Sequence, residues 1–183
     1  MGLVFLIGLP YDRRMYLAPT PYVTGTLAQA PSGRAQSFHT LKLMRDCVRA
    51  ARTDPRIIQA AVGVVYLTPE RDAHAEASAL FKYVRDYIRY IADVFEVETL
   101  CDPVMTLQRM VGDCDDKTTL LCALFESVGF PTRFVMAGYN GSDFEHVYCQ
   151  VLLNDFWTNC DPTEKGELGY APPLHTALYI EKV

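Results

Sequence analysis

The sequence has no apolar run that approaches the roughly 20 residues of a membrane-spanning helix. Gly2 to Leu9 is hydrophobic, but no basic segment precedes it and the polar sequence Tyr-Asp-Arg-Arg follows it closely. The small residues at 28–30 resemble a cleavage box, yet they lie too far from this run to serve it. We therefore predict no signal peptide and interpret Gly2 to Leu9 as a buried strand or an anchor.

Positive charge is also in short supply. The chain has 17 Lys and Arg against 22 Asp and Glu, a net charge of −5, and the basic residues are scattered. Proteins that bind nucleic acid usually gather basic residues on one face or along one helix. We therefore expect neither a nucleic-acid partner nor a membrane span.

The six cysteines form no Cys-x-x-Cys pair and no Cys/His zinc pattern. An even number of cysteines is compatible with disulfides. Because no signal peptide is recognised, mostly reduced thiols are the favoured alternative. The cysteines stand at positions 47, 101, 114, 122, 149 and 160.

The length of 183 residues, half of them apolar, predicts one domain with a core of its own. Residues 1–34 are rich in Pro, Gly, Tyr and Thr, and we interpret them as an N-terminal extension with short strands at 15–17 and 22–27. Residues 35–183 then form the domain.

Periodicity predicts helices first and strands afterwards. Helices are expected at 37–53, at 57–66, from the capping sequence Thr68-Pro69-Glu70 through Phe95, and at 114–128, with a short helical stretch at 106–110. Strands are expected at 133–137, 147–153 and 156–160, the last two joined by a turn at Asn154-Asp155. Helices that precede an antiparallel sheet indicate an α+β domain.

The sequence Gly112-Asp113-Cys114 has the features of an activated nucleophile. Asp113 is a natural N-cap, which places Cys114 in the first turn of a helix, where unpaired amides and the helix dipole favour thiolate over thiol. The same amides are candidate donors to an oxyanion. The alternative is that Cys114 is a small buried apolar residue, as most cysteines are.

Acidic residues beside Cys114 oppose this activation, because negative charge raises the pKa of a thiol. One explanation is that these carboxylates face away and cap helix amides. The other is that Asp113 and Asp115 hold a cation such as Ca²⁺, which offsets their charge. No cofactor is required under the first explanation, and Ca²⁺ is the alternative under the second.

Two downstream residues complete a candidate triad. His146 begins an alternating strand, on the face that carries Tyr148 and Gln150, and is the candidate base. Asp161 follows the next strand, from which its carboxylate is expected to reach a ring nitrogen of His146 and fix its tautomer. Gln108, six residues before Cys114, is a candidate oxyanion donor together with the Cys114 amide, or else an exposed helix residue.

These residues resemble the transglutaminase-like superfamily of the papain-like fold, over about residues 75–163. The motifs that carry the resemblance are Gly112-Asp-Cys-Asp-Asp116, Leu120-Leu-Cys-Ala-Leu124, Gly129-Phe-Pro-Thr-Arg133, His146-Val-Tyr and Asp161-Pro-Thr163. The resemblance implies helices packed on an antiparallel sheet, with Cys114 as nucleophile, His146 as base and acid, and Asp161 as the residue that orients the histidine.

The activity implied is that of a cysteine protease, amidase or acyltransferase that acts on a protein or peptide through a thioester. No tryptophan lies beside Cys114, unlike in animal transglutaminases, so hydrolysis is expected at least as much as cross-linking. Tyr90 to Pro103 resembles a compact prokaryotic and phage branch, which implies a bacteriophage origin, virion partners, and a location in the host cytoplasm or the phage particle. The alternative function is a non-enzymatic virion component that keeps the fold. A further alternative is a metal-binding regulatory module built on Asp113 and Asp115, because a related group of calcium-dependent proteases also has acids beside the cysteine.

Overall fold

The computed structural model of the protein describes residues 33–92, 99–139, 144–170 and 175–183. Within these ranges the fold is α+β, as the sequence predicts. The helices are α1 Arg34–Ala51, α2 Pro55–Val65, α3 Ala73–Tyr87, α4 Pro103–Arg109 and α5 Cys114–Ser127. The strands are β1 Arg89–Tyr90, β2 Val111–Gly112, β3 Thr132–Gly138, β4 His146–Leu153, β5 Phe156–Cys160 and β6 Ala177–Lys182.

Four strands form an antiparallel sheet in the order β5-β4-β3-β6. The predicted hairpin between β4 and β5 is confirmed, because Asn154 and Asp155 both have positive φ values, 48° and 68°, as tight hairpin turns require. The pairing of β6 with β3 is not predicted from the sequence. In this pairing, Tyr179 of β6 lies opposite Met136 of β3.

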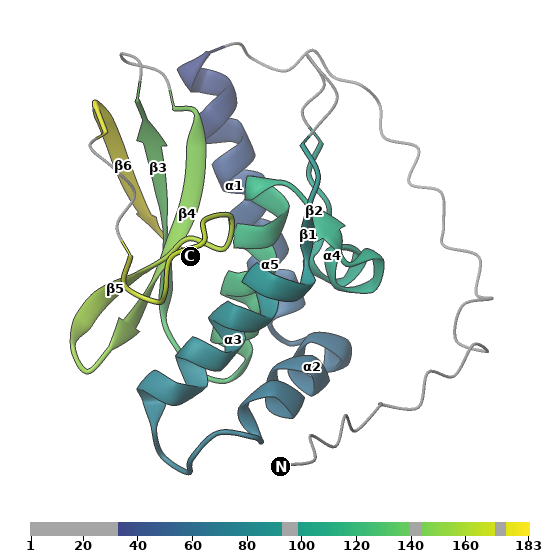
Figure 1. Ribbon diagram of the computed structural model, residues 1–183. Helices are drawn as coiled ribbons and strands as arrows, with labels where there is room; N and C mark the ends of the chain where they lie inside the picture. The colour runs from purple at the N-terminus through teal and green to yellow at the C-terminus, as the bar shows by residue number, and fades with distance from the viewer. Residues whose placement is uncertain (1–32, 93–98, 140–143, 171–174) are drawn as a thin grey trace, which may run out of the picture. The chain divides into compact units, whose positions relative to one another are not determined.

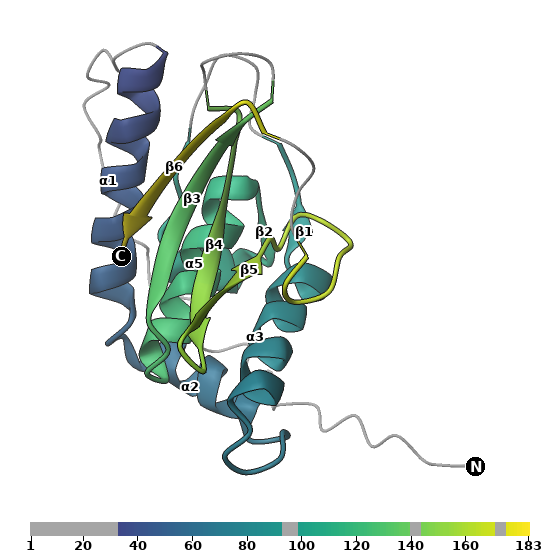
Figure 2. The same ribbon diagram turned by 90° about the vertical axis from the view of Figure 1, so that its left-hand side faces the viewer.

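The helices pack on one face of this sheet, with α5 next to the strands (Figures 1 and 2). Residues 116–125 of α5 are all buried, so this helix is the centre of the core. Its apolar partners come from the predicted inner positions of α1, namely Leu41, Met44, Val48 and Ala51, and from alternate residues of β4. The alternation predicted for β4 is therefore confirmed.

The boundaries of α1 are close to the predicted range of 37–53. Asp54 and Pro55, expected to end the first helix, follow its last residue closely and also start the second. The Asp54 side chain accepts a hydrogen bond from the Arg56 amide, and Pro55 occupies the first turn of α2. An N-cap and Pro at the first helical position are typical of a helix start.

The predicted start of the third helix at Thr68 is wrong. The Thr68 hydroxyl donates to the Val65 carbonyl and closes α2, and the cap of α3 is Asp72, whose side chain accepts from the Ala75 amide. The predicted end is also wrong, because α3 stops at Tyr87 and the chain enters β1. Ile91, expected inside the helix, is exposed.

A short parallel pair replaces the end of that helix: Arg89 pairs with Val111, and Tyr90 pairs with Gly112. This pairing holds the segment before Cys114 against the end of α3. The strands predicted at 15–17 and 22–27, the proposed N-terminal extension and Phe95 lie outside the described residues. Across the part of the chain that the structure describes, no helix is long and apolar enough to cross a membrane.

Candidate active site

Cys114 is the first residue of α5, and Asp113 is its N-cap as predicted. One carboxylate oxygen of Asp113, Oδ1, accepts hydrogen bonds from the amides of Asp115 at 3.1 Å and Asp116 at 3.2 Å. A side-chain acceptor at this position satisfies amides that have no partner within the helix. The helix therefore begins at a fixed residue, and the thiol takes a fixed place.

Gly112 allows this start to pack tightly. A Cβ at position 112 would lie 2.6 Å from the Cβ of Asp116, a distance that ordinary side chains do not adopt. Asp116 in turn accepts a hydrogen bond from the Cys101 amide at 2.8 Å. The glycine of the motif thus permits an acid on α5 to anchor the segment before α4.

The thiol of Cys114 lies against β4. The Val147 amide donates toward the thiol, and the Thr118 hydroxyl, one turn further along α5, donates to the Val147 carbonyl at 3.2 Å. Because Val147 follows His146 directly, the start of α5 and the start of β4 are brought together. Cys114 and His146 therefore lie in the same part of the fold.

The electrostatic surroundings of Cys114 differ from the sequence-based expectation. Burial raises the pKa of the thiol well above its usual value, and the charges of Asp115 and Asp113 raise it further. Asp115 does not face away, since its Oδ1 lies 3.4 Å from the Cys114 Sγ. The Val147 amide acts in the opposite direction by lowering this pKa. The resting side chain is therefore a thiol rather than a thiolate.

Asp161 binds His146. The Nε2 of His146 lies 2.7 Å from Oδ2 of Asp161, whose side chain is only 1% exposed. The other carboxylate oxygen, Oδ1, accepts from the amide of Thr163 at 3.0 Å and from its hydroxyl at 2.7 Å. Burial alone would raise the pKa of Asp161. The hydrogen bond and charge of His146, together with the two hydrogen bonds from Thr163, outweigh the burial, and the pKa is lowered.

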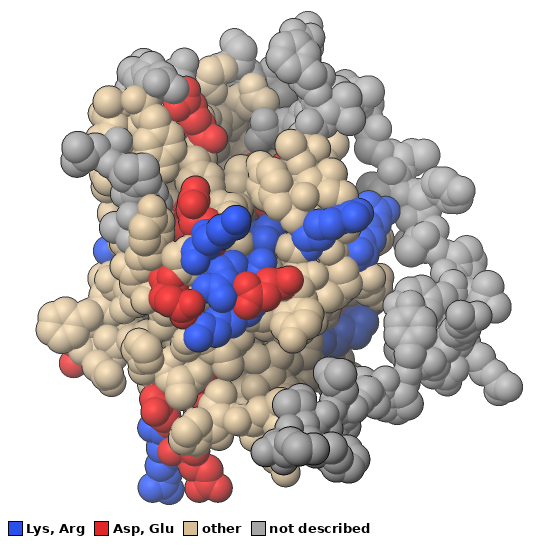
Figure 3. Space-filling view, viewed as in Figure 1, with Lys and Arg blue, Asp and Glu red and all other residues tan. Residues whose placement is uncertain are grey.

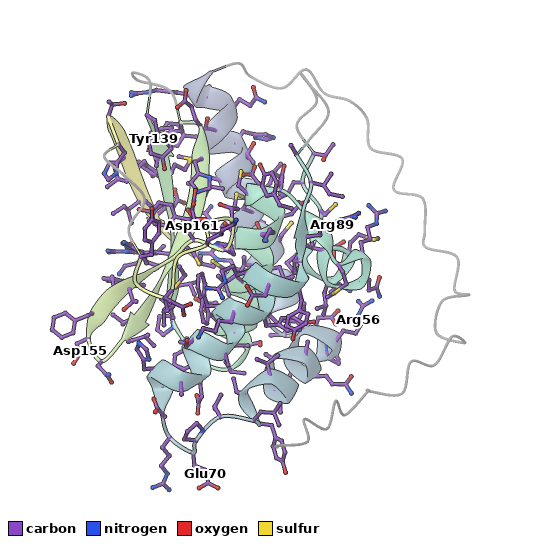
Figure 4. The ribbon with its side chains drawn as sticks, in the orientation of Figure 1. Arg56, Glu70, Arg89, Tyr139, Asp155 and Asp161 are labelled. Carbon is purple, nitrogen blue, oxygen red and sulfur yellow. The ribbon has the colours of Figure 1, made fainter. Side chains whose placement is uncertain are left out.

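The register of the hairpin explains this contact. Cys149 of β4 pairs with Cys160 of β5, so the segment that continues from Cys160 runs back alongside the residues before Cys149. Asp161, labelled in Figure 4 on the segment after β5, thereby arrives next to His146. Thr163 is a site residue that the sequence analysis did not single out, although Asp-x-Thr is a recognisable turn in which the threonine bonds back to the carboxylate.

His146 lies on the predicted strand face, but that face is less accessible than expected. Tyr148 is only 4% exposed, because it clusters with Val135 and Ala137 of β3 and with Tyr139. The rings of His146 and Tyr148 stack with centroids 6.1 Å apart. This packing fixes one face of the imidazole.

Lys117 is a second residue whose role is not predicted from the sequence. It is buried in α5, one turn after Cys114, and its Nζ donates to the carbonyls of Ile88 at 2.8 Å and Arg85 at 3.3 Å. Burial lowers the pKa of Lys117 to about 8, although Asp161 and Asp86 act to raise it. The available signal for Lys117 in the sequence was its position directly after Asp115 and Asp116, in a helix that otherwise buries this face.

The remaining predicted site residues are not assembled in the same way. Gln108 is exposed on α4, and its role as an oxyanion donor stays a prediction. Asp113 is occupied by the two amides that it caps, and among the described residues no three His, Cys, Asp or Glu side chains form a metal-binding group. The donor set of Asp113 and Asp115 is therefore a poor fit to Ca²⁺, which takes six to eight oxygens.

A cavity of about 430 Å³ opens beside His146. Its volume falls in the range of small-ligand sites. The residues that line it are Tyr90, Tyr139, His146, Thr163 and Glu164.

The family model of the transglutaminase-like superfamily matches residues 62–162, more than half of the chain. The chain belongs to the transglutaminase-like superfamily. The match includes Cys114, His146 and Asp161, and begins somewhat before the region in which the motifs show the resemblance. No curated protein matches the sequence closely enough to count as a relative.

Solved structures show a similar fold at low sequence identity. A proposed cysteine protease from Cytophaga hutchinsonii is 15% identical with a TM-score of 0.51, over 70% of this chain and 50% of its own. A proposed protease from Parabacteroides distasonis is 10% identical with a TM-score of 0.57, over 75% of this chain and 27% of its own. This chain thus spans half, or less, of these structural neighbours.

Proposed function

We propose that this member of the superfamily is a cysteine hydrolase or acyltransferase that cleaves an amide or peptide bond with Cys114, His146 and Asp161. The observation that carries the proposal is the 2.7 Å contact between His146 and the buried Asp161. His146 begins β4, and the amide of the next residue, Val147, faces the Cys114 thiol. The structural neighbours proposed as proteases support a protein or peptide substrate.

His146 has two ring nitrogens, one for Asp161 and, in the proposed mechanism, one for the Cys114 thiol. Asp161 accepts from Nε2 and thereby leaves Nδ1 unprotonated in the neutral ring, as a base toward the thiol. Because burial and Asp115 raise the pKa of Cys114, proton transfer to Nδ1 accompanies attack instead of preceding it. The sulfur forms a bond to the amide carbonyl carbon while its proton passes to His146.

The oxyanion that forms needs a hydrogen-bond donor. The amides of Asp115 and Asp116 are bound by Asp113, and the Lys117 amide donates to the Asp113 carbonyl. The Cys114 amide is then the first-turn donor that remains for the oxyanion. Gln108 would have to turn inward to contribute.

Collapse of the intermediate breaks the carbon–nitrogen bond. His146 gives its proton to the leaving amine, and a thioester of Cys114 remains. Water then yields a carboxylic acid, or a second amine yields a new amide, with His146 again as base. Asp161 stabilises the imidazolium in each step.

A non-enzymatic role is the second candidate. The same burial and acidic neighbours that raise the pKa of Cys114 are compatible with a thiol retained only for packing. The virion location of such a component, and the phage origin, rest on the resemblance of the sequence alone and stay predictions, as does a dependence on Ca²⁺.

Alkylation of Cys114 tests the catalytic role. We would measure the rate of iodoacetamide modification of each cysteine from pH 5 to 10 by peptide mass, in the parent chain, in His146→Ala and in His39→Ala. His39 is an exposed residue of α1 and serves as the control. We expect Cys114 to react at neutral pH, and His146→Ala to slow it by roughly ten-fold or more, because the base is lost.

An unreactive Cys114 in folded protein, or equal rates in the parent and His146→Ala, would favour the non-enzymatic role. Equal slowing by His146→Ala and His39→Ala would point to a general loss of fold. Circular dichroism of each variant separates this case from a local effect.

A further inference from the structure

The cavity beside His146 has walls that suit a positively charged group. Tyr90 and Tyr139 contribute aromatic rings, and Glu164 contributes a carboxylate. Cations are attracted to the faces of aromatic rings within about 6 Å. No lysine or arginine is among the residues that line the cavity within the described chain.

Glu164 is available to an ion-pair partner. Its side chain is exposed, and it makes no ion pair with any described residue. Glu167, another acid of this loop, differs from Glu164 because it forms ion pairs with Lys82 and Arg85. These ion pairs join α3 to the loop. Figure 3 shows basic and acidic side chains interleaved over the middle of the face in view.

Further negative charge acts on Tyr139, one of the residues that line the cavity. Tyr139, on its wall, has a raised pKa because of burial and then because of the charges of Asp161 and Glu164. Glu145 lies beside the same tyrosine and accepts from its amide at 3.1 Å. The phenol therefore sits in a negative field, which favours a cation in the neighbouring space.

We propose that this cavity binds the basic side chain of a lysine or arginine residue in the peptide substrate. The proposal rests on the proposed function, because it makes the cavity a specificity pocket for the bond attacked by Cys114. The side chain extends past His146 between Tyr90 and Tyr139, and its charge pairs with Glu164. Thr163 joins this pocket to the triad, since it both lines the cavity and binds Asp161.

Binding to an inactive protein tests the pocket without using the catalytic step. In the Cys114→Ala background we would measure fluorescence anisotropy with labelled Ala-Ala-Xaa-Ala-Ala peptides, where Xaa is arginine, lysine, citrulline or glutamate. Citrulline has nearly the shape of arginine but no charge. We expect the arginine and lysine peptides to bind about ten-fold more tightly than the citrulline peptide, as one ion pair with aromatic support provides.

Two further variants decide which group is responsible for the preference for a charged side chain. Glu164→Gln is expected to bring the arginine-to-citrulline ratio close to one. Asp155→Asn removes one negative charge from the exposed β4–β5 turn and is expected to leave the ratio unchanged.

Equal or undetectable binding of the arginine and citrulline peptides overturns the proposal, and so does a preference that survives Glu164→Gln. Neither result bears on catalysis, which the alkylation experiment tests separately. A reactive Cys114 without a charge preference removes the pocket alone. A charge preference with an unreactive Cys114 keeps the pocket and removes the enzyme.

Discussion

At the scale of single residues, Cys114 is under opposing influences. The helix start and the Val147 amide favour the thiolate, whereas burial, Asp115 and Asp113 favour the thiol, and the second group prevails. The acids are retained in structural positions, because Asp113 caps α5 and Asp116 holds the Cys101 amide. The acids thus fix the place of the thiol and at the same time keep it protonated. Under the proposed function, His146 therefore removes the proton during attack.

Asp161→Asn is expected to destabilise the fold at pH 7 by about 2 kcal/mol, because a buried charge-assisted hydrogen bond to His146 is weakened. The pKa of Asp161 is lowered in the folded state, so its contribution is fully present above about pH 4, the unfolded value, and is lost as the pH falls through the lower folded value. Urea unfolding at pH 7, 5 and 3.5 measures this difference.

The control for Asp161→Asn is Asp155→Asn, in the exposed turn, which should change the free energy of unfolding by less than about 0.5 kcal/mol. Equal effects of the two substitutions, or an Asp161 effect that grows as the pH falls, would contradict the assigned hydrogen bond between Asp161 and His146.

At the scale of elements, the site depends on how α5 is held between α3 and β4. Thr118 ties its second turn to the Val147 carbonyl, and Lys117 ties the opposite side to the carbonyls at the end of α3. A cation is favourable at a helix C-terminus, where carbonyls lack partners. Lys117 therefore positions the first turns of α5 from within the protein.

Lys117→Met is expected to alter how stability depends on pH. The pKa of Lys117 is about 8 in the folded protein, below the ordinary value of about 10.4, so the unfolded chain binds more protons between these values. The free energy of unfolding of the parent should therefore rise between about pH 8 and pH 10.4 relative to Lys117→Met, by up to about 3 kcal/mol. Denaturant unfolding of both proteins from pH 7 to 10 measures it.

Lys82→Met is the matched control, because Lys82 is exposed on α3. Its pH profile should run parallel to that of the parent. A parallel profile for Lys117→Met as well would show that the Lys117 ammonium is not desolvated in the folded state.

At the scale of the whole described domain, burial is concentrated in α5 and the strands beside it. Residues 116–125 are buried without interruption, whereas α2 exposes Ile58 and Val62. Amides in a fully buried central element exchange mainly through global unfolding, and those in peripheral elements also exchange through local opening.

Hydrogen exchange followed by mass spectrometry should therefore find the slowest amides in α5 and β4, and faster exchange in α2. Cys114→Ala should leave this order unchanged, since it removes only a sulfur atom at the edge of the core. Exchange of α5 at the rate of α2 would contradict the central place of this helix.

Features that depend on a few neighbouring residues could be predicted from the sequence. Asp113 caps α5 and Gly129 follows its end with a φ of 92°, because capping is decided within one helical turn. The Asn154-Asp155 turn follows from the ability of these residues to adopt positive φ. The superfamily and the order of Cys114, His146 and Asp161 follow from motifs of this local kind.

Other features arise only when distant segments meet. The end of α3 at Tyr87 is decided by pairing of β1 with β2, which overrides a periodicity that would continue the helix. Asp115 faces the thiol, and Lys117 finds the carbonyls of α3, because of how α5 packs. The cavity between Tyr90, Tyr139 and Glu164 joins residues from separate segments. The sequence by itself determined the local structure and the identity of the candidate reactive groups. The tertiary structure decided the burial, charge environment and distances of these groups, because those properties depend on contacts between residues far apart in the chain.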